Sequence, residues 1–128
     1  MLFRSPEAME KDEDNLIFIN KVRELLENNL STEGYTIDML CSTMGMSRTV
    51  FYHKIKEVTG RPPVEYMLTF KMERAKMLLK SGRHSIAEIA DMLGYCDAKY
   101  FGRKFKDYYH ICPTGYLKKI EQAPAVNS

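Results

Sequence analysis

Apolar residues recur along most of this chain at the three- and four-residue spacing of an amphipathic helix. The pattern breaks at glycine, proline, serine and aspartate positions that are typical of helix ends and helix starts. No segment shows the two-residue alternation of a half-buried strand. The chain is therefore predicted to be all-α, with seven helices at residues 15–30, 36–44, 47–59, 64–80, 85–93, 97–109 and 113–120.

Two segments of the chain repeat each other. Ile-x-x-Leu-Cys-x-x-Met-Gly at residues 37–45 returns as Ile-x-x-Ile-Ala-x-x-Leu-Gly at residues 86–94, an offset of 49. Glycine accepts the positive φ of a tight turn, and serine or aspartate then caps a second helix. Each copy predicts a helix-turn-helix. Beyond the turn the offset is 50, and the matched pairs are Ser47 with Asp97, Phe51 with Phe101, Ile55 with Phe105, Pro63 with Pro113 and Tyr66 with Tyr116.

The second helix of each copy repeats its inner face but not its outer face. The inner positions are Phe51, Ile55 and Val58 in one copy and Phe101, Phe105 and Tyr108 in the other. A shared inner face indicates one scaffold, and a varied outer face indicates two different targets. The outer positions are Arg48, Thr49, Tyr52, His53 and Lys56, then Ala98, Lys99, Gly102, Arg103 and Lys106.

Two other helices show apolar stripes that predict their buried faces. The first helix carries Leu16, Ile19, Val22, Leu25 or Leu26, and Asn29. The longest helical pattern, residues 64–80, carries Val64, Leu68, Met72, Ala75 and Leu79. At the usual rise per residue that helix is about 26 Å long. It could hold two reading helices near the ~34 Å separation of successive major grooves on one DNA face.

The positive charge of the chain is concentrated on the repeated segments. The 128 residues carry a net charge of only +2. Residues 1–14 hold two basic and five acidic side chains, whereas residues 48–61 and 97–106 each hold four basic and one acidic. A solvated helix face would explain this distribution, and so would a nucleic-acid surface. An α-helix with small or polar residues near its start fits the major groove, with lysines further along meeting phosphates.

Enzymatic and metal-binding functions find little support, and no catalytic residue, metal ligand set or cofactor is predicted. His110-x-Cys112 is a single His/Cys pair, and structural zinc needs four ligands. Three cysteines without CxxC spacing indicate free thiols in the cytoplasm, with a redox role of Cys96 or Cys112 left open. No apolar run is long enough to span a membrane. The rival function is a helical protein–protein module that applies its basic faces to an acidic partner.

The quoted motifs resemble the DNA-binding domain of AraC/XylS-type transcription regulators. The resemblance covers about residues 18–119 and rests on GMSRTVFYHKIKEVTGRPPVEYM (45–67), KMERAKMLL (71–79), IAEIADMLGYCDAKYFGRKFKDYY (86–109) and CPTGYLK (112–118). It implies promoter DNA as the partner, and two lobes joined by a central helix. It implies base reading by Arg48, Thr49, Tyr52, His53, Ala98, Lys99 and Arg103, and backbone contacts by Lys54, Lys56, Lys104 and Lys106.

The resemblance also sets expectations for the rest of the protein. The sequence of residues 45–60 is similar to that of C-terminal domains of hybrid two-component regulators. An upstream sensor or receiver domain is therefore expected. RNA polymerase is a further candidate partner. His110 stands where the family commonly has the glycine that ends the second recognition helix. The expected divisions are an acidic linker at 1–14, the DNA-binding domain at 15–120 (lobes 15–62 and 83–120, linker helix 63–80) and a disordered tail at 121–128.

Overall fold

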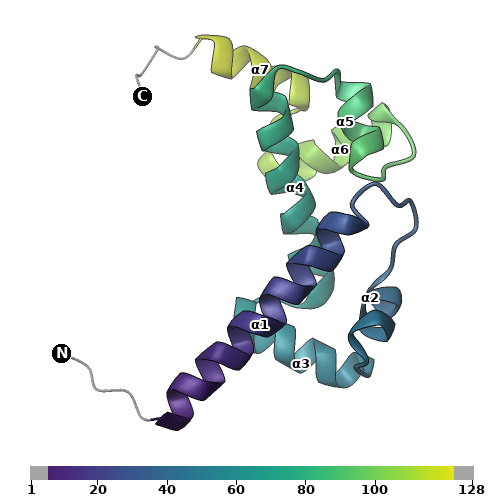
Figure 1. The fold of residues 1–128 in the computed structure, drawn as a ribbon. Coiled ribbons are helices and arrows are strands. Elements are labelled where there is room, and N and C mark those ends of the chain that lie inside the picture. Colours follow the sequence, from purple (N-terminus) through teal and green to yellow (C-terminus); the bar gives the residue numbers. More distant parts are fainter. Residues whose placement is uncertain (1–5, 123–128) are drawn as a thin grey trace, which may run out of the picture. The chain divides into compact units, whose positions relative to one another are not determined.

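The computed structural model describes residues 6–122, with side chains described from Lys11 to Glu121. Seven α-helices account for most of these residues, and no β-strand occurs among them (Figure 1). The predicted all-α class is therefore confirmed. The helices are α1 (Pro6–Asn28), α2 (Ile37–Met44), α3 (Arg48–Thr59), α4 (Pro63–Ser81), α5 (Ile86–Met92), α6 (Ala98–Tyr109) and α7 (Pro113–Gln122).

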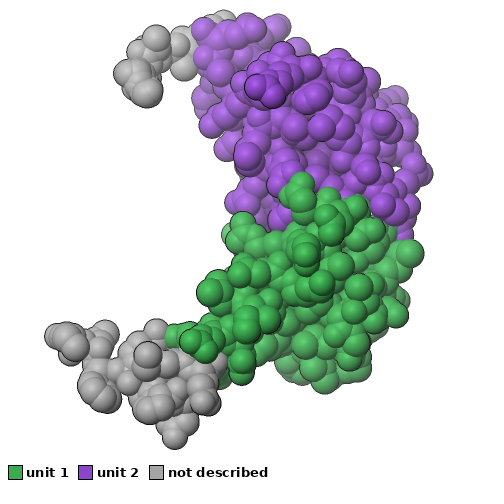
Figure 2. Space-filling view, in the orientation of Figure 1, with its two compact units in different colours: residues 1–29, 35–67 green, residues 30–34, 68–128 purple. Residues whose placement is uncertain are grey.

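The chain forms two compact units (Figure 2). In its described part, unit 1 comprises residues 6–29 and 35–67, and unit 2 comprises residues 30–34 and 68–122. Each unit contains one helix-turn-helix, α2–α3 in unit 1 and α5–α6 in unit 2. The division falls between Met67 and Leu68, inside α4. The domain boundaries inferred from sequence remain predictions.

The core of unit 1 joins α1 to the helix-turn-helix. Phe51 and Ile55 of α3 are at most 1% exposed, and the Phe51 ring lies 5.7 Å from the ring of Phe18 on α1. Truncating such a buried aromatic side chain costs about 3–5 kcal/mol, so these contacts fix α3 on its support. The other buried members are Val22, Leu25, Leu26, Leu40 and Cys41.

The core of unit 2 repeats this arrangement, with Phe105 in the place that Ile55 has in unit 1. Phe101 and Phe105 of α6 are fully buried, with ring centroids 5.9 Å apart. They pack in one cluster with Met72, Ala75, Leu79, Ile89, Ala90 and Leu93. A polar contact adds to it, since the Tyr108 hydroxyl donates to the Thr69 hydroxyl oxygen at 2.9 Å.

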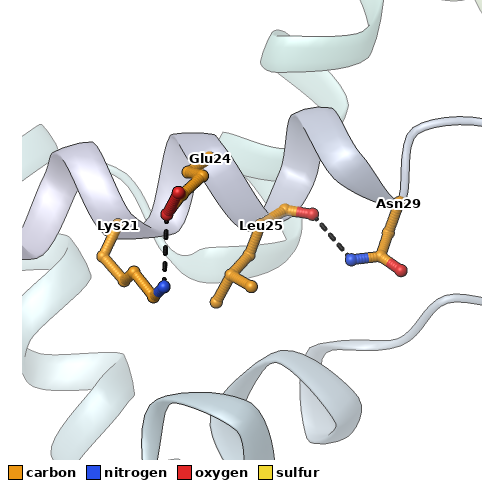
Figure 3. Close-up of polar contacts among 4 residues, drawn as sticks. All are labelled: Lys21, Glu24, Leu25 and Asn29. Carbon is orange, nitrogen blue, oxygen red and sulfur yellow. Dashed lines mark hydrogen bonds and ion pairs between the residues drawn. The ribbon is translucent and has the colours of Figure 1, made fainter.

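Helix starts follow the predicted caps. Ser47 and Asp97 accept hydrogen bonds from the backbone N–H groups of Val50 and Tyr100, which satisfies one free donor at the start of α3 and of α6. Thr36 caps α2 in the same way, and Ser85 caps α5. At the C-terminal end of α1, the backbone N–H of Asn29 donates to the Leu25 carbonyl. The side-chain amide of Asn29 donates to the same oxygen at 2.8 Å (Figure 3).

The first helix begins earlier than predicted. It starts at Pro6 rather than Asn15, so residues 6–14 of the expected linker are helical. Proline is favourable at the first helical position because its φ is already helical and its missing N–H would have no partner there. Lys11 Nζ also lies 2.6 Å from Glu57 Oε2 on α3, which ties this part of α1 to unit 1. The rest of the acidic segment, residues 1–5, lies outside the described residues.

Other expectations were also wrong in detail. Leu16 and Val64, both assigned to buried stripes, are 59% and 70% exposed. Phe18 takes the inward place on α1, and Thr69, which a reading by hydrophobicity overlooks, is 7% exposed on α4. At the C-terminal end, α7 continues through Gln122. The remainder of the expected disordered tail, residues 123–128, is outside the described residues.

Candidate nucleic-acid interface

The two helix-turn-helix turns have the same backbone hydrogen bonds. The residue after each turn glycine donates its N–H to a carbonyl five positions back: Met46 to Cys41 O at 3.0 Å, and Tyr95 to Ala90 O at 2.9 Å. Since Met46 and Tyr95 are equivalent, the inserted residue of the second copy is Cys96. Both turns are therefore closed by the same hydrogen bond, and the two copies differ only after it, where Cys96 is inserted before the cap of α6.

The helices α3 and α6 also share one burial pattern. The two inward phenylalanines, Phe51 and Phe101, and the residues one turn later, Ile55 and Phe105, are all at most 1% exposed. The predicted third inward residues, Val58 and Tyr108, are half-buried. The opposite faces remain available to solvent, and these carry the candidate DNA-contacting residues.

The candidate base-reading residues of α3 lie together. Arg48, Thr49, Tyr52 and His53 are all exposed, and they line one shallow hollow of about 330 Å³. The His53 ring meets the Tyr52 ring edge-on, with centroids 5.9 Å apart. Arg48 is held from α2, because Asp38 Oδ1 lies 3.1 Å from Arg48 Nε. The helix therefore presents a guanidinium, a hydroxyl, a phenol and an imidazole on one surface.

The two candidate backbone lysines of α3 have different surroundings. Lys54 is half-buried and donates through Nζ to Asn15 Oδ1 on α1 at 2.8 Å, with the Phe18 ring 5.9 Å away. Lys56 is exposed, and its Nζ lies 5.9 Å from the Tyr52 ring. Of the two, Lys56 is the more available to a phosphate.

The outer face of α6 carries smaller side chains than the outer face of α3, because Ala98 and Gly102 lie on it. Lys99 and Arg103 are exposed and Ala98 is half-buried. Among the described residues, Arg103 has no ion-pair or hydrogen-bond partner. A Cβ placed on Gly102 would meet no atom within 4 Å, so the glycine leaves this face open rather than making room for a neighbour. Lys106 is exposed, and Lys104 Nζ lies 5.6 Å from the Tyr100 ring.

This geometry can be compared with known proteins. A sequence profile described as a helix-turn-helix domain matches residues 40–119, which include the first helix-turn-helix from Leu40 onward, all of α4 and the whole second helix-turn-helix. The chain belongs to the AraC-type helix-turn-helix family. The family is one of helix-turn-helix DNA-binding domains of transcription regulators, which is not an enzyme class.

Three similar proteins illustrate the membership in the AraC-type family. The raffinose operon transcriptional regulatory protein RafR of Pediococcus pentosaceus is 35% identical over 74% of this chain and 34% of its own length. The histidine kinase P4 of Formosa agariphila is 26% identical over 81% of this chain and 8% of its own length. The C-terminal domain of the two-component response regulator yesN from Fusobacterium nucleatum is 31% identical, with a TM-score of 0.68, over 75% of this chain and 93% of that domain.

The chain spans well under half the length of the curated relatives that it matches, from 8% of the histidine kinase P4 to 40% of the Msm operon regulatory protein of Streptococcus mutans. In the structural comparison, by contrast, this chain covers nearly the whole yesN domain. The similarity therefore describes an AraC-type DNA-binding domain, and the activities of the longer relatives are not part of it.

The pairing of Asp38 with Arg48 was not predicted from the sequence, although a comparison of the two copies of the repeat points to it. At the offset of 49, Asp38 corresponds to Ala87, and at the offset of 50 Arg48 corresponds to Ala98. The ion pair of unit 1 therefore has two alanines in its place in unit 2. Ala87 and Ala98 there line a hollow of about 470 Å³ together with Glu88, Ala90, Asp91, Tyr95, Cys96 and Asp97.

The cysteines and histidines form no site of their own among residues 11–121. Cys41 is buried, and this burial raises the pKa of its thiol, whereas Cys96 and Cys112 are exposed free thiols. Within the described part of the chain, no group of three or more His, Cys, Asp or Glu side chains could hold a metal ion. None of the helices in that part is both long and apolar enough to cross a membrane.

Proposed function

We propose that this AraC-type domain binds specific double-stranded DNA at promoters by inserting α3 and α6 into successive major grooves. The observation that supports this proposal is the pairing of inner faces that are buried at the same positions with outer faces that differ between the two helices. A structural support would need only the inner face, whereas a two-part sequence reader needs both.

On α3, we assign base contacts to Arg48, Thr49, Tyr52 and His53. Arginine can donate two hydrogen bonds to guanine, and the threonine methyl suits the methyl group of thymine. The phenol of Tyr52 and the ring of His53 offer hydrogen bonds or stacking. Their shared hollow and their exposure support this assignment.

On α6, we assign base contacts to Ala98, Lys99 and Arg103. Ala98 presents only a methyl group, which suits contact with thymine, while Arg103 carries the donors for guanine. Gly102 lies between them with open space around its Cα, so the helix backbone can approach the base edges closely there. This helix therefore depends on fewer long side chains than α3 does.

The lysines supply contacts that do not depend on base sequence. Lys56 and Lys106 are exposed and occupy equivalent places on α3 and α6, so each is assigned to a phosphate. Lys54 and Lys104 are half-buried in equivalent places and are assigned weaker backbone contacts. Phosphate contacts fix the register of a reading helix, and they make the affinity depend on salt.

The domain is further proposed to act as the output module of a two-component regulator. The similarity to the response regulator yesN and to the histidine kinase P4 supports an upstream receiver or sensor domain. RNA polymerase is the partner through which promoter binding would change transcription. Contact with promoter DNA would place this segment in the cytoplasm. No catalytic step, metal or cofactor is needed for this role.

The test measures fluorescence anisotropy with labelled duplexes of ~25 base pairs, long enough for two half-sites one helical turn apart. Promoter fragments and shuffled versions are compared over a salt series. Arg103→Ala should lose about 1–3 kcal/mol on the proper site and relax the preference at one base pair. Lys106→Ala should weaken binding to every sequence and lower the salt slope by roughly 1. Weak binding that ignores sequence would reject the proposal and favour an acidic protein partner.

A further inference from the structure

The internal repeat extends to the helix that precedes each helix-turn-helix. At an offset of 50, residues 18, 21, 22 and 25 of α1 correspond to residues 68, 71, 72 and 75 of α4. Val22 and Met72 are both fully buried, and Leu25 and Ala75 are both buried. Each unit thus contains one copy of a three-helix repeat, and the same place can be compared in unit 1 and unit 2.

In unit 2, a tyrosine fills the place beside this preceding helix. Tyr95 follows the turn, and its ring centroid lies 5.7 Å from those of Tyr100 and Phe101. Lys71 Nζ on α4 lies 5.0 Å from the Tyr95 ring, a cation–π contact. Burial raises the pKa of Tyr95 to about 12, as expected for an enclosed phenol.

In unit 1, the corresponding place is open. Met46 is the counterpart of Tyr95, with the same backbone hydrogen bond, and Val50 is the counterpart of Tyr100. Val50 is 55% exposed, and Ile17 on α1 is 67% exposed. A hollow of about 340 Å³ lies beside Met46, lined by Asp14, Ile17, Phe18, Lys21, Thr43, Met44, Met46 and Lys54. That volume is at the small end for ligand sites and suits one ring with its flanking atoms.

The charged groups at this hollow favour an acidic occupant. Lys21, the counterpart of Lys71, and Lys54 contribute two positive charges, and Asp14 contributes one negative charge. Lys54 is held by the neutral amide of Asn15. Lys21 Nζ pairs with Glu24 Oε1 at 3.2 Å, but both side chains are more than half exposed, and such pairs contribute little and release easily (Figure 3).

We propose that this hollow is a docking site for an aromatic side chain on a partner polypeptide, flanked there by carboxylates. The ring occupies in unit 1 the place that Tyr95 occupies in unit 2, with the Lys21 ammonium over its face. The apolar lining from Ile17, Phe18 and Met46 buries the ring, and the two lysines bind the flanking carboxylates. Occupancy of this site does not require α3 or α6 to contact DNA, so the inference does not rest on the proposed function. The two share Lys54, whose ammonium group meets either a DNA phosphate or a partner carboxylate, not both at once.

The test uses the whole chain with ¹³C-labelled methionine methyl groups, titrated with acetyl-Asp-Tyr-Asp-amide. Saturable shifts are expected at Met44 and Met46, with no shift at Met77, which is exposed on α4 in unit 2. Replacing the probe's tyrosine by alanine should weaken binding about tenfold, because the buried ring area is lost. Replacing both aspartates by lysine should weaken it as well, because the rim then repels the probe.

Two variants decide whether the shifts come from this hollow. Met46→Tyr puts a ring of the protein's own into the place, as Tyr95 does in unit 2, and should abolish binding while the protein stays folded. Met77→Tyr adds the same side chain elsewhere and should leave binding unchanged. Absence of saturable shifts in the native chain, equal binding of the alanine probe, or undiminished binding by Met46→Tyr would each overturn the proposal.

Discussion

The Asp38 carboxylate lies 3.1 Å from Nε of Arg48, so α2 holds the first residue of α3. The pair is 65% and 72% exposed, and ion pairs of this kind contribute about 0–1 kcal/mol to folding. Its larger effect is expected on DNA. While Asp38 compensates the guanidinium, Arg48 gains less from any nearby phosphate and depends more on finding a suitable base.

Asp38→Asn is therefore expected to raise affinity for shuffled DNA more than for a promoter site, and to increase the salt slope by roughly 1. Anisotropy titrations measure both quantities. In an Arg48→Ala background the same substitution should have no such effect, and Glu65→Gln controls for the loss of one acidic charge in unit 1. Additive effects of Asp38→Asn and Arg48→Ala would show that the two residues act separately on DNA.

Gly94→Ala should destabilise the protein much more than Gly45→Ala. The two glycines hold the same place in the repeat, with φ of 77° and 70°, and each alanine would meet a left-handed strain of about 1–2 kcal/mol. Only at Gly94 would the new Cβ also lie 2.9 Å from the Leu30 carbonyl oxygen. That clash should add about 1–3 kcal/mol. Urea unfolding followed by circular dichroism measures the difference, and equal losses would mean that the backbone around Gly94 yields freely.

His110→Gly should stabilise unit 2. His110 ends α6 at a φ of 63°, with its N–H donating to the Lys106 carbonyl at 2.7 Å, where the first copy uses Gly60 at a φ of 78°. Relief of left-handed strain should outweigh the extra freedom of glycine in the unfolded chain, for a net gain of about 0.5–1 kcal/mol. The reverse variant, Gly60→His, should lose a similar amount in thermal unfolding. A destabilised His110→Gly protein would show that the imidazole itself contributes to α6.

The capping box of α5 should give the protein an acid-sensitive contribution. Glu88 accepts the backbone N–H of Ser85 at 2.7 Å, and this hydrogen bond holds the pKa of the Glu88 carboxyl below its ordinary value of 4.5. A lowered pKa means that the contribution is present above pH ~4.5 and is lost as pH falls through the lower, folded-state value.

Glu88→Gln should accordingly be less stable than the native chain at neutral pH and equal to it in strong acid. Urea unfolding at a series of pH values measures the gap between the two proteins. The counterpart of Glu88 in unit 1 is Met39, so Met39→Glu should build a second capping box with Thr36 and stabilise unit 1 at neutral pH. A gap that stays constant with pH would assign the effect of Glu88 to something other than its charge.

The sequence predicted the features that depend on local signals. The caps at Ser47 and Asp97 and the inward places of Phe51 and Phe101 follow from residue type and spacing, because each is decided within one or two turns of helix. The repeat strengthened these inferences, since the same signals occur twice in the same order.

The features that were missed depend on neighbours from elsewhere in the chain. Residues 16–19 of α1 are all apolar, so a helical period can be drawn through Leu16 as easily as through Phe18, and only contact with Phe51 selects Phe18. Thr69 is buried because Tyr108 provides a hydrogen-bond partner, which hydrophobicity cannot reveal. For the site, exposure of the candidate residues was predictable from the helical period, whereas the attachment of Arg48 to Asp38 and of Lys54 to Asn15 was not.

The carbonyl groups of Leu30 and Thr32 lie close to Gly94, and all three residues belong to unit 2. Residues 35–67, which include α2 and α3, separate Leu30 and Thr32 from the rest of unit 2 in the sequence and belong to unit 1. This interleaving sets an order on biosynthesis. Unit 1 has all of its residues once Met67 has been translated, whereas residues 30–34 must wait for Gly94, sixty positions beyond Gly34. It also means that the units cannot be separated by one cut, because a fragment that begins at Leu68 lacks residues 30–34, of which Leu30 and Thr32 lie against its own turn.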